Sequence, residues 1–268
     1  MNSNNWAAIA GVMVAIAITT TMDATGYTVF SALPLLPLTG IFWFLQKFST
    51  REMGLTWGPA RHYGLALAYP LLVLGGIALI AWLAGAVDTS ATDWRKTFLN
   101  MSLMSTTGML MVLLTEEGFF RGWLWAALKR AGHGDAAVLL WSTLAFTAWH
   151  ISAISLDTGF DVPANEVPIY LVNATLLGAV FGLLRMISGS VVVATVSHAV
   201  WNGIDYPLFG YGEKVGALGI QDTHVYGPEV GILGTVFSLG FLIWLWRRSA
   251  KDRNNHSTVD APGMESRR

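Results

Sequence analysis

The sequence has 268 residues, of which 53% are hydrophobic and 12% charged, with a formal net charge of -1 and no cysteine. Soluble globular domains carry roughly 25% charged residues, so this composition excludes an ordinary soluble domain. The near-zero net charge gives no field that would attract nucleic acid, and the lack of cysteine excludes disulfides, thiolate metal sites and a cysteine nucleophile.

Long uncharged apolar runs predict an all-α, polytopic integral membrane protein, because a run of about 18 or more apolar residues is enough to cross a bilayer as a helix. In chain order, the eight predicted spans lie at about residues 6–22, 26–46, 63–87, 105–128, 136–154, 167–187, 190–207 and 229–246. No basic segment precedes the first run, which favours a retained span over a cleaved signal peptide. Residues 94–104 are predicted to form an interfacial amphipathic segment. We therefore expect a single transmembrane domain over residues 1–250 and a disordered cytoplasmic tail over residues 251–268.

Basic residues predict the side of the membrane on which each loop lies, because cytoplasmic loops are enriched in lysine and arginine. With the N-terminus inside, the inner loops and the tail hold twelve basic residues, whereas the outer loops hold only three, Arg95, Lys96 and Lys214. An even number of spans then places both termini in the cytoplasm.

Three ionisable side chains of the fourth span need an explanation, because burying a charge in a bilayer is costly. They are Glu116, Glu117 and Arg121. Glu117 and Arg121 are four residues apart with the acid N-terminal, which predicts an ion pair on one helix face. Glu116 lies about 100° around the helix and has no such partner. A free buried carboxylate of this kind suits a general base.

Two further spans carry polar motifs. The fifth contains His150, and the seventh contains His198 and Asn202, which are four residues apart and so share a helix face. Each feature alone also has a structural explanation: the acid–base pair as helix packing, His150 as a donor to a backbone carbonyl, and the pair in the seventh span as a clamp between helices. Carboxylate and imidazole groups on three helices at a similar depth favour one shared site.

In chain order, the motifs Glu-Glu-x-x-x-Arg, Phe-x-x-x-His and His-x-x-x-Asn resemble those of the CAAX prenyl endopeptidase and bacteriocin-processing family (CPBP, or ABI). The matching residues are Glu116, Glu117 and Arg121, then Phe146 and His150, then His198 and Asn202. The resemblance covers about residues 105–207, the core of that family, and no motif position departs from the pattern. It implies about eight transmembrane helices around an active site in a polar cavity within the bilayer.

The resemblance also implies an intramembrane endopeptidase that acts on membrane-associated or lipidated peptides. Glu116 and His150 would activate a water molecule, while His198 and Asn202 would stabilise the oxyanion of the tetrahedral intermediate. In a second version, a Zn²⁺ ion held by Glu116, His150 and His198 activates the water, because carboxylate and imidazole are zinc ligands. The supporting residues would be Glu117, Arg121 and Phe146.

Other functions and chemistries fit the sequence less well. A non-catalytic scaffold or bacteriocin-immunity protein of the same fold would not need Glu116, His150 and His198 together. A transporter predicts repeat symmetry and broken helices, and neither is visible in the sequence. The motifs His-Glu-x-x-His and Gly-x-Ser-x-Gly are absent, as are paired membrane aspartates. Asp205, near the outer end of the seventh span, could tune the site electrostatically but is expected to be a solvated residue at a helix end.

The expected partners are membrane lipids and a peptide or protein substrate that enters from the bilayer or from the cytoplasmic side. Nucleic acid is not expected to bind. The short loops are typical of prokaryotic members of the resembling family, which predicts a multi-pass protein of a prokaryotic plasma membrane.

Overall fold

The structure is a computed structural model that describes residues 3–160, 162–212 and 214–259, and within these residues it is almost entirely helical. The α-helices are α1 (Ser3–Ala24), α2 (Leu35–Gln46), α3 (Arg61–Leu83), α4 (Trp94–Leu114), α5 (Trp125–Arg130), α6 (Asp135–Trp149), α7 (Ile151–Ser155), α8 (Val167–Ser188), α9 (Val191–Phe209), α10 (Thr223–Tyr226) and α11 (Ile232–Val259). A short 3₁₀ helix, η1 (Thr28–Phe30), precedes α2, and a π-helix, η2 (Gly118–Leu124), precedes α5. Strands β1 (Gly210–Tyr211) and β2 (Lys214–Val215) form a small antiparallel hairpin.

Each of the eight predicted spans corresponds to helix in the structure, so the all-α membrane fold is confirmed. Among the described residues, six helical segments are long and apolar enough to cross a membrane: Asn5–Ala24, Thr28–Gln46, Arg61–Leu83, Trp94–Arg130, Asp135–Ser155 and Val167–Ser188. The last two predicted spans form α9 and α11 but are not among the six. Polar residues explain this difference. The motif of the seventh span lowers the mean hydropathy of α9, and Arg247 and Arg248 shorten the apolar part of α11, which begins at Ile232.

Two predicted boundaries differ from the structure. The segment 94–104, expected to lie apart at the interface, is the first half of α4 and continues into the fourth span. α11 runs to Val259, beyond its predicted end at 246, and so enters the tail predicted to be disordered. The rest of that tail, residues 260–268, lies outside the described residues.

The fourth span is interrupted where its charged motif begins. α4 ends at Leu114, and Thr115 leaves the helical conformation with φ -106° and ψ -94°. The chain then winds as the π-helix η2. A Cβ at Gly118 would lie 2.6 Å from the carbonyl oxygen of Leu113, so only glycine allows the backbone to approach this closely. π-turns within α-helices are frequent at functional sites, and this one directly follows Glu116 and Glu117.

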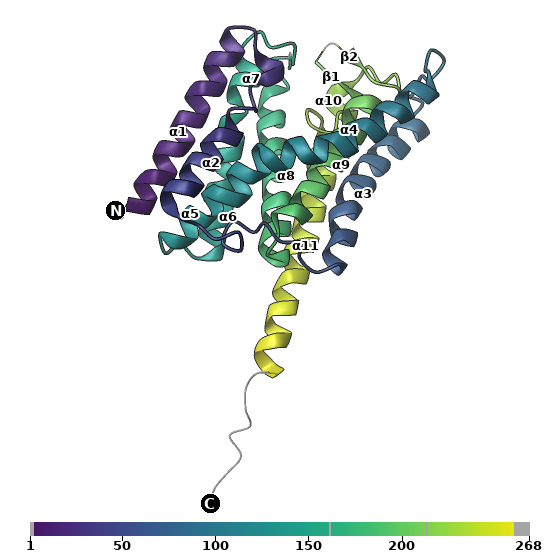
Figure 1. Ribbon diagram of the computed structural model, residues 1–268. Helices are drawn as coiled ribbons and strands as arrows, with labels where there is room; N and C mark the ends of the chain where they lie inside the picture. Colours follow the sequence, from purple (N-terminus) through teal and green to yellow (C-terminus); the bar gives the residue numbers. More distant parts are fainter. Residues whose placement is uncertain (1–2, 161, 213, 260–268) are drawn as a thin grey trace, which may run out of the picture.

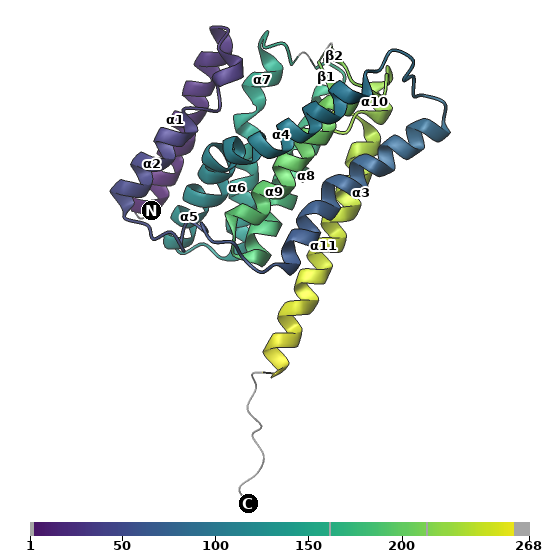
Figure 2. The same ribbon diagram turned by 45° about the vertical axis from the view of Figure 1, so that its right-hand side comes forward.

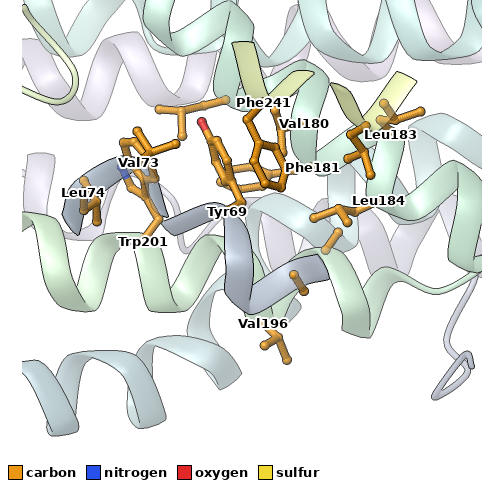
Figure 3. Packing of buried hydrophobic residues seen from close by; sticks show 14 of the residues in the cluster. Tyr69, Val73, Leu74, Val180, Phe181, Leu183, Leu184, Val196, Trp201 and Phe241 are labelled. Atoms are coloured by element: carbon orange, nitrogen blue, oxygen red, sulfur yellow. The ribbon is translucent and has the colours of Figure 1, made fainter. Parts of the chain in front are cut away.

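Two apolar clusters hold the bundle together. One lies between α3, α8, α9 and α11 around Tyr69, whose ring stacks on Trp201 at 5.1 Å and meets the edge of Phe181 at 6.1 Å (Figure 3). The other joins α1, α2, η2, α5 and α6 around Trp123, on which Phe42 stacks at 4.5 Å. Aromatic side chains bury the largest areas, so these contacts fix the helices that border the site described below.

Arg185 and Arg130 tie the loop between α2 and α3 to the bundle. Arg185, one of the twelve basic residues that the sequence assigns to the inner loops and tail, instead lies buried in α8 and donates from Nε to the carbonyl of Arg121 (3.0 Å). It also donates to the carbonyl of Glu52 (3.3 Å). The backbone N–H of Ser49 and then the Arg130 guanidinium lower the pKa of Glu52 to about 2. The Glu52 side chain is 44% exposed, so its ion pair contributes at most about 1 kcal/mol.

α4 crosses closely over α9 (Figures 1 and 2). At the crossing, Gly203 faces Ser105, and a Cβ on Gly203 would lie 2.7 Å from the Ser105 nitrogen and 2.9 Å from its Cα. These are backbone atoms, so a side chain at 203 can be accommodated only if the two helices move apart. The absence of a side chain thus sets the distance between the helix that leads to Glu116 and the helix that carries His198.

Gly203→Ala is expected to destabilise the protein by about 1–3 kcal/mol, the usual cost of overpacking a tight contact. The measurement is the thermal midpoint of the purified protein in detergent. The matched control is Gly240→Ala in α11, where a Cβ would meet nothing within 4 Å. That change should be neutral or stabilising by up to about 1 kcal/mol, because alanine is the better helix former. Equal midpoints for the two variants would contradict the close crossing.

Candidate active site

The three predicted polar motifs meet in one place. Glu116 lies between the end of α4 and the start of η2, His150 directly follows α6, and His198 lies in the middle of α9. The Glu116 Oε2 atom is 3.9 Å from His150 Nε2 and 3.8 Å from His198 Nε2. Their side chains are 15%, 20% and 6% exposed, respectively, so they lie in the interior of the bundle but are not sealed off.

Hydrogen bonds on the far side of each imidazole fix its orientation. His150 Nδ1 lies 2.8 Å from the carbonyl oxygen of Phe146, which can only accept, so Nδ1 carries the proton. His198 Nδ1 lies 3.0 Å from Glu117 Oε1, and an ionised carboxylate likewise only accepts. In both neutral rings the unprotonated Nε2 therefore faces Glu116. His150 makes the carbonyl contact expected of a purely structural histidine and also faces the other motif residues.

The predicted ion pair between Glu117 and Arg121 is present and fully buried. Arg121 NH1 lies 3.1 Å from Glu117 Oε1, and both side chains are 0% exposed. Arg121 NH2 also donates to the carbonyl of Gly178 in α8 (2.9 Å). The guanidinium lies 4.2 Å from the ring centroid of Phe146, which gives that motif residue a packing role. Because the same Glu117 oxygen contacts His198, the pair joins η2 to both α8 and α9.

A cavity of about 110 Å³, here called the site cavity, opens beside Glu116, His150, His198 and Asn202. The ring of Phe181 stacks on His198 at 4.6 Å and 13°, which fixes that imidazole against one wall. The volume is enough for several water molecules but is below the 300–1,000 Å³ typical of ligand pockets. The structure thus places all four predicted catalytic residues at one cavity that is large enough for water molecules.

The site cavity also contains residues that the sequence did not single out. They are Ala153, Phe160, Tyr170, Ala174, Leu177, Phe181, Trp201, Tyr206 and Glu229. Glu229 accepts a hydrogen bond from Trp201 Nε1 (3.2 Å). It lies in the turn before α11, at the predicted boundary of the last span, where an acidic residue looks like an ordinary solvated loop residue. Its only sequence signal was an acid immediately beside an apolar run.

The expectation for Asp205 was wrong. Instead of being solvated at a helix end, its side chain is buried, with the residue 2% exposed. α9 continues to Phe209. The backbone of Ala217 and Leu218, after the hairpin, donates to its last turn, and Glu229, before α11, accepts from Trp201, so Asp205 lies inside the protein. Its Oδ1 accepts no hydrogen bond from any residue that the structure describes.

Glu116, His150 and His198 have the donor types of a zinc site, but their spacing does not suit one. In the described part of the chain, no group of three or more His, Asp or Glu side chains is placed to hold a metal ion. Two ligands at about 2.0–2.1 Å from one zinc ion lie roughly 3.3–3.4 Å apart. The observed separations from Glu116 are 3.8 and 3.9 Å. Both separations are therefore longer than one shared zinc ion would set.

Comparison with protein-family models gives one match. Residues 98–204 match the model described as type II CAAX prenyl endopeptidase Rce1-like. This segment contains all three motifs, from Glu116 to Asn202, and the resemblance predicted from them is confirmed over these residues. No curated protein and no solved structure matches the chain. The family match and the apolar helices together point to an integral membrane protein.

Proposed function

We propose, from the premise that residues 98–204 form an Rce1-like core, that this protein is an intramembrane endopeptidase that hydrolyses peptide bonds of membrane-associated or lipidated substrates. The observation that carries the proposal is the carboxylate of Glu116 facing the Nε2 atoms of His150 and His198 across 3.8–3.9 Å at a cavity of about 110 Å³. A direct hydrogen bond would be shorter, and a water molecule can bridge this spacing.

Glu116 and His150 are both hydrogen-bond acceptors toward the site cavity. A water between them donates one hydrogen bond to each and directs a lone pair at the scissile carbonyl carbon. Glu116 takes the proton as the C–O bond forms, and later gives a proton to the leaving amine nitrogen as the C–N bond breaks. Two acceptors thus orient the nucleophile before it reacts.

His198 and Asn202 both line the site cavity, lie one helical turn apart on α9 and serve the oxyanion. The Asn202 amide is a donor in any protonation state. His198 donates from Nε2 only when its ring is protonated, because Nδ1 already donates to Glu117. In that state the buried Glu117 carboxylate balances the ring charge, as the aspartate of a serine-protease triad does for its histidine. The ion pair with Arg121 keeps Glu117 in place.

The test is a comparison of protein N-termini in membranes from cells that express the wild-type chain or Glu116→Gln at matched levels. New N-termini that appear only with the wild type are expected, and the cut sites identify the substrate. Identical sets of N-termini, with any cellular phenotype surviving the substitution, would contradict the protease proposal and favour a scaffold or immunity role.

Removal of metal ions is expected to leave the hydrolysis rate unchanged, because the proposed water activation needs only Glu116 and His150. The purified protein would be dialysed against a strong chelator and assayed on a peptide that contains one of the identified cut sites. Loss of the rate, together with its recovery on addition of Zn²⁺, would contradict this mechanism and support the version in which a metal activates the water.

We propose the orientation that the basic residues predict, with both termini in the cytoplasm. Figure 1 places α7, α10 and the hairpin at one end of the bundle, opposite α5 and the end of α11. His150, Ala153 and Tyr206 of the site cavity lie near the end that carries α7 and the hairpin. In this orientation that end faces away from the cytoplasm, and we propose substrate access from there instead of from the cytoplasmic side.

Because the natural chain lacks cysteine, single cysteines can report the orientation. Ser90→Cys, before α4, is expected to react with a membrane-impermeant maleimide in intact cells. Thr50→Cys, between α2 and α3, is expected to react only after lysis. Both positions are exposed in the structure, so a difference in labelling reports the side of the membrane on which each one lies. The reverse labelling pattern would contradict the orientation.

A further inference from the structure

A second cavity adjoins the site cavity. Its volume is about 420 Å³, and it lies among the segment before α8, the end of α9, the hairpin and the turn before α11. Phe160 and Glu229 line both cavities, so the two are neighbours that share a wall. We call the second one the acidic cavity, because Glu166, Asp205 and Glu229 line it.

These three carboxylates have few partners. Glu166, 5% exposed, accepts from the hydroxyl of Thr223 at 3.1 and 3.3 Å, its one side-chain hydrogen-bond donor among the described residues. Asp205, 2% exposed, shares the Trp201 Nε1–H donor with Glu229, and its Oδ1 atom has no hydrogen-bond partner among the described residues. No salt bridge from a described residue reaches any of the three. Buried charges are normally paired, so the ionised form of this cluster calls for a cation.

The cation is of a particular kind. In the part of the chain that the structure describes, the carboxylates are not placed to converge on a metal ion. An ammonium or guanidinium group has several donors that point in different directions and can satisfy separated carboxylates. Lys214, which also lines the cavity, is exposed and donates to the hydroxyl of Tyr211 (2.6 Å), so it does not fill this role.

The helix that carries the oxyanion residues also carries the most buried of these acids. His198, Asn202 and Asp205 are spaced at i, i+4 and i+7, which places them along one face of α9. With a rise of 1.5 Å per residue, Asp205 lies about 10 Å along the axis from His198. An extended peptide covers that distance with about three residues. A substrate side chain about three residues from the scissile bond can therefore reach Asp205.

We propose that the acidic cavity is a subsite for a lysine or arginine side chain of the substrate, located about three residues from the peptide bond that is cut. This assignment rests on the proposed protease function. Asp205 and Glu166 bind the charged group, and Glu229 marks the boundary with the site cavity. The recognised substrates are thus membrane-associated peptides with a basic residue near the cleavage site.

The first test uses the N-termini produced by the wild-type protein. The expected result is an enrichment of lysine or arginine at one fixed position about three residues from the cut. If wild type and Glu116→Gln give the same N-termini, the protease function itself fails. If wild-type cut sites exist but show no basic preference, only the subsite proposal is overturned.

The second test compares one substrate peptide with its lysine against the same peptide with norleucine at that position. For the wild type, kcat/KM is expected to be at least about tenfold higher for the lysine peptide, mainly through KM, as a charge pair worth about 1.4 kcal/mol would give. Asp205→Asn should abolish the preference, and Asp205→Glu should retain part of it. An equal loss of rate on both peptides in Asp205→Asn would show that Asp205 has only a structural role and would overturn the proposal.

Two further variants separate the subsite from the surrounding surface charge and from a folding defect. Asp157→Asn removes an exposed acid from the loop after α7 that does not line the cavity, and it should leave the preference intact. A loss of preference in Asp157→Asn would assign the effect to the general field of that surface and overturn the subsite. If Asp205→Asn does not fold, Glu166→Gln is expected to lower the preference for lysine, and an unchanged preference there would overturn the proposal.

Discussion

Glu116→Gln is expected to lower kcat for peptide hydrolysis by about 10³-fold, with little change in KM. Glutamine has nearly the same size as glutamate and can still hydrogen-bond to a water, but it cannot accept the proton from the attacking water. A positioned general base contributes about 10²–10⁴-fold to a rate, and here the same group returns the proton to the leaving amine. The measurement is steady-state cleavage of a peptide with an identified cut site by purified protein in lipid nanodiscs.

The matched control for this variant is Glu52→Gln. It makes the same chemical change in the loop between α2 and α3, where the side chain pairs with Arg130 at the surface. It should keep the wild-type kcat and lose no more than about 1 kcal/mol of stability. The thermal midpoint of Glu116→Gln should also stay near that of the wild type. A folded Glu116→Gln protein with wild-type activity would remove Glu116 from the mechanism.

Arg121→Met is expected to destabilise the protein by about 3–5 kcal/mol, because it leaves Glu117 as an unpaired charge in the interior. The Glu117 and Arg121 side chains are 0% exposed, and the guanidinium also donates to the carbonyl of Gly178. Methionine fills a similar volume without the charge, so the loss measures electrostatics more than packing. The readout is the free energy of unfolding in mixed detergent.

The double variant Glu117→Gln/Arg121→Met provides the control. With both charges removed, no uncompensated charge remains, so the double variant should be more stable than Arg121→Met alone. It should not recover full activity, since Glu117 also holds Nδ1 of His198. If the destabilisation of the double variant equals the sum of those measured for Glu117→Gln and Arg121→Met separately, the two side chains do not interact energetically.

The sequence was sufficient for the parts of this fold and site that depend on local spacing. Apolar runs located the helices, and the position of Glu117 four residues before Arg121 predicted their buried pair. The three motifs lie at similar depths in their apolar runs, which predicted that Glu116, His150 and His198 share one site, and their side chains do lie close together. These features are properties of single helices of known length, so they can be predicted before the packing is known.

The features that the sequence missed depend on packing between distant segments. Asp205 is buried because the segment after the hairpin and the turn before α11 contact α9, and no local sequence pattern predicts these contacts. Glu229 reaches the site from a turn about thirty residues after His198 in the chain. The hydrogen bond from His198 to Glu117 crosses between helices and needs their relative rotation. A pattern within one helix cannot supply that information.

The π-helix η2 has a consequence for how the motif tolerates change in length. A π-turn closes its hydrogen bond one residue later than an α-turn, so η2 is equivalent to an α-helix into which one residue has been inserted. Deletion of the codon for residue 118, 119 or 120 would restore regular α-helix, but it would also shorten the spacing from Glu117 to Arg121 from four residues to three. The carboxylate that pairs with Arg121 and contacts His198 would then have to reach both from a different backbone position. In evolutionary terms, the spacing of this motif is protected by geometry, and insertions or deletions are acceptable in the loops but not within η2.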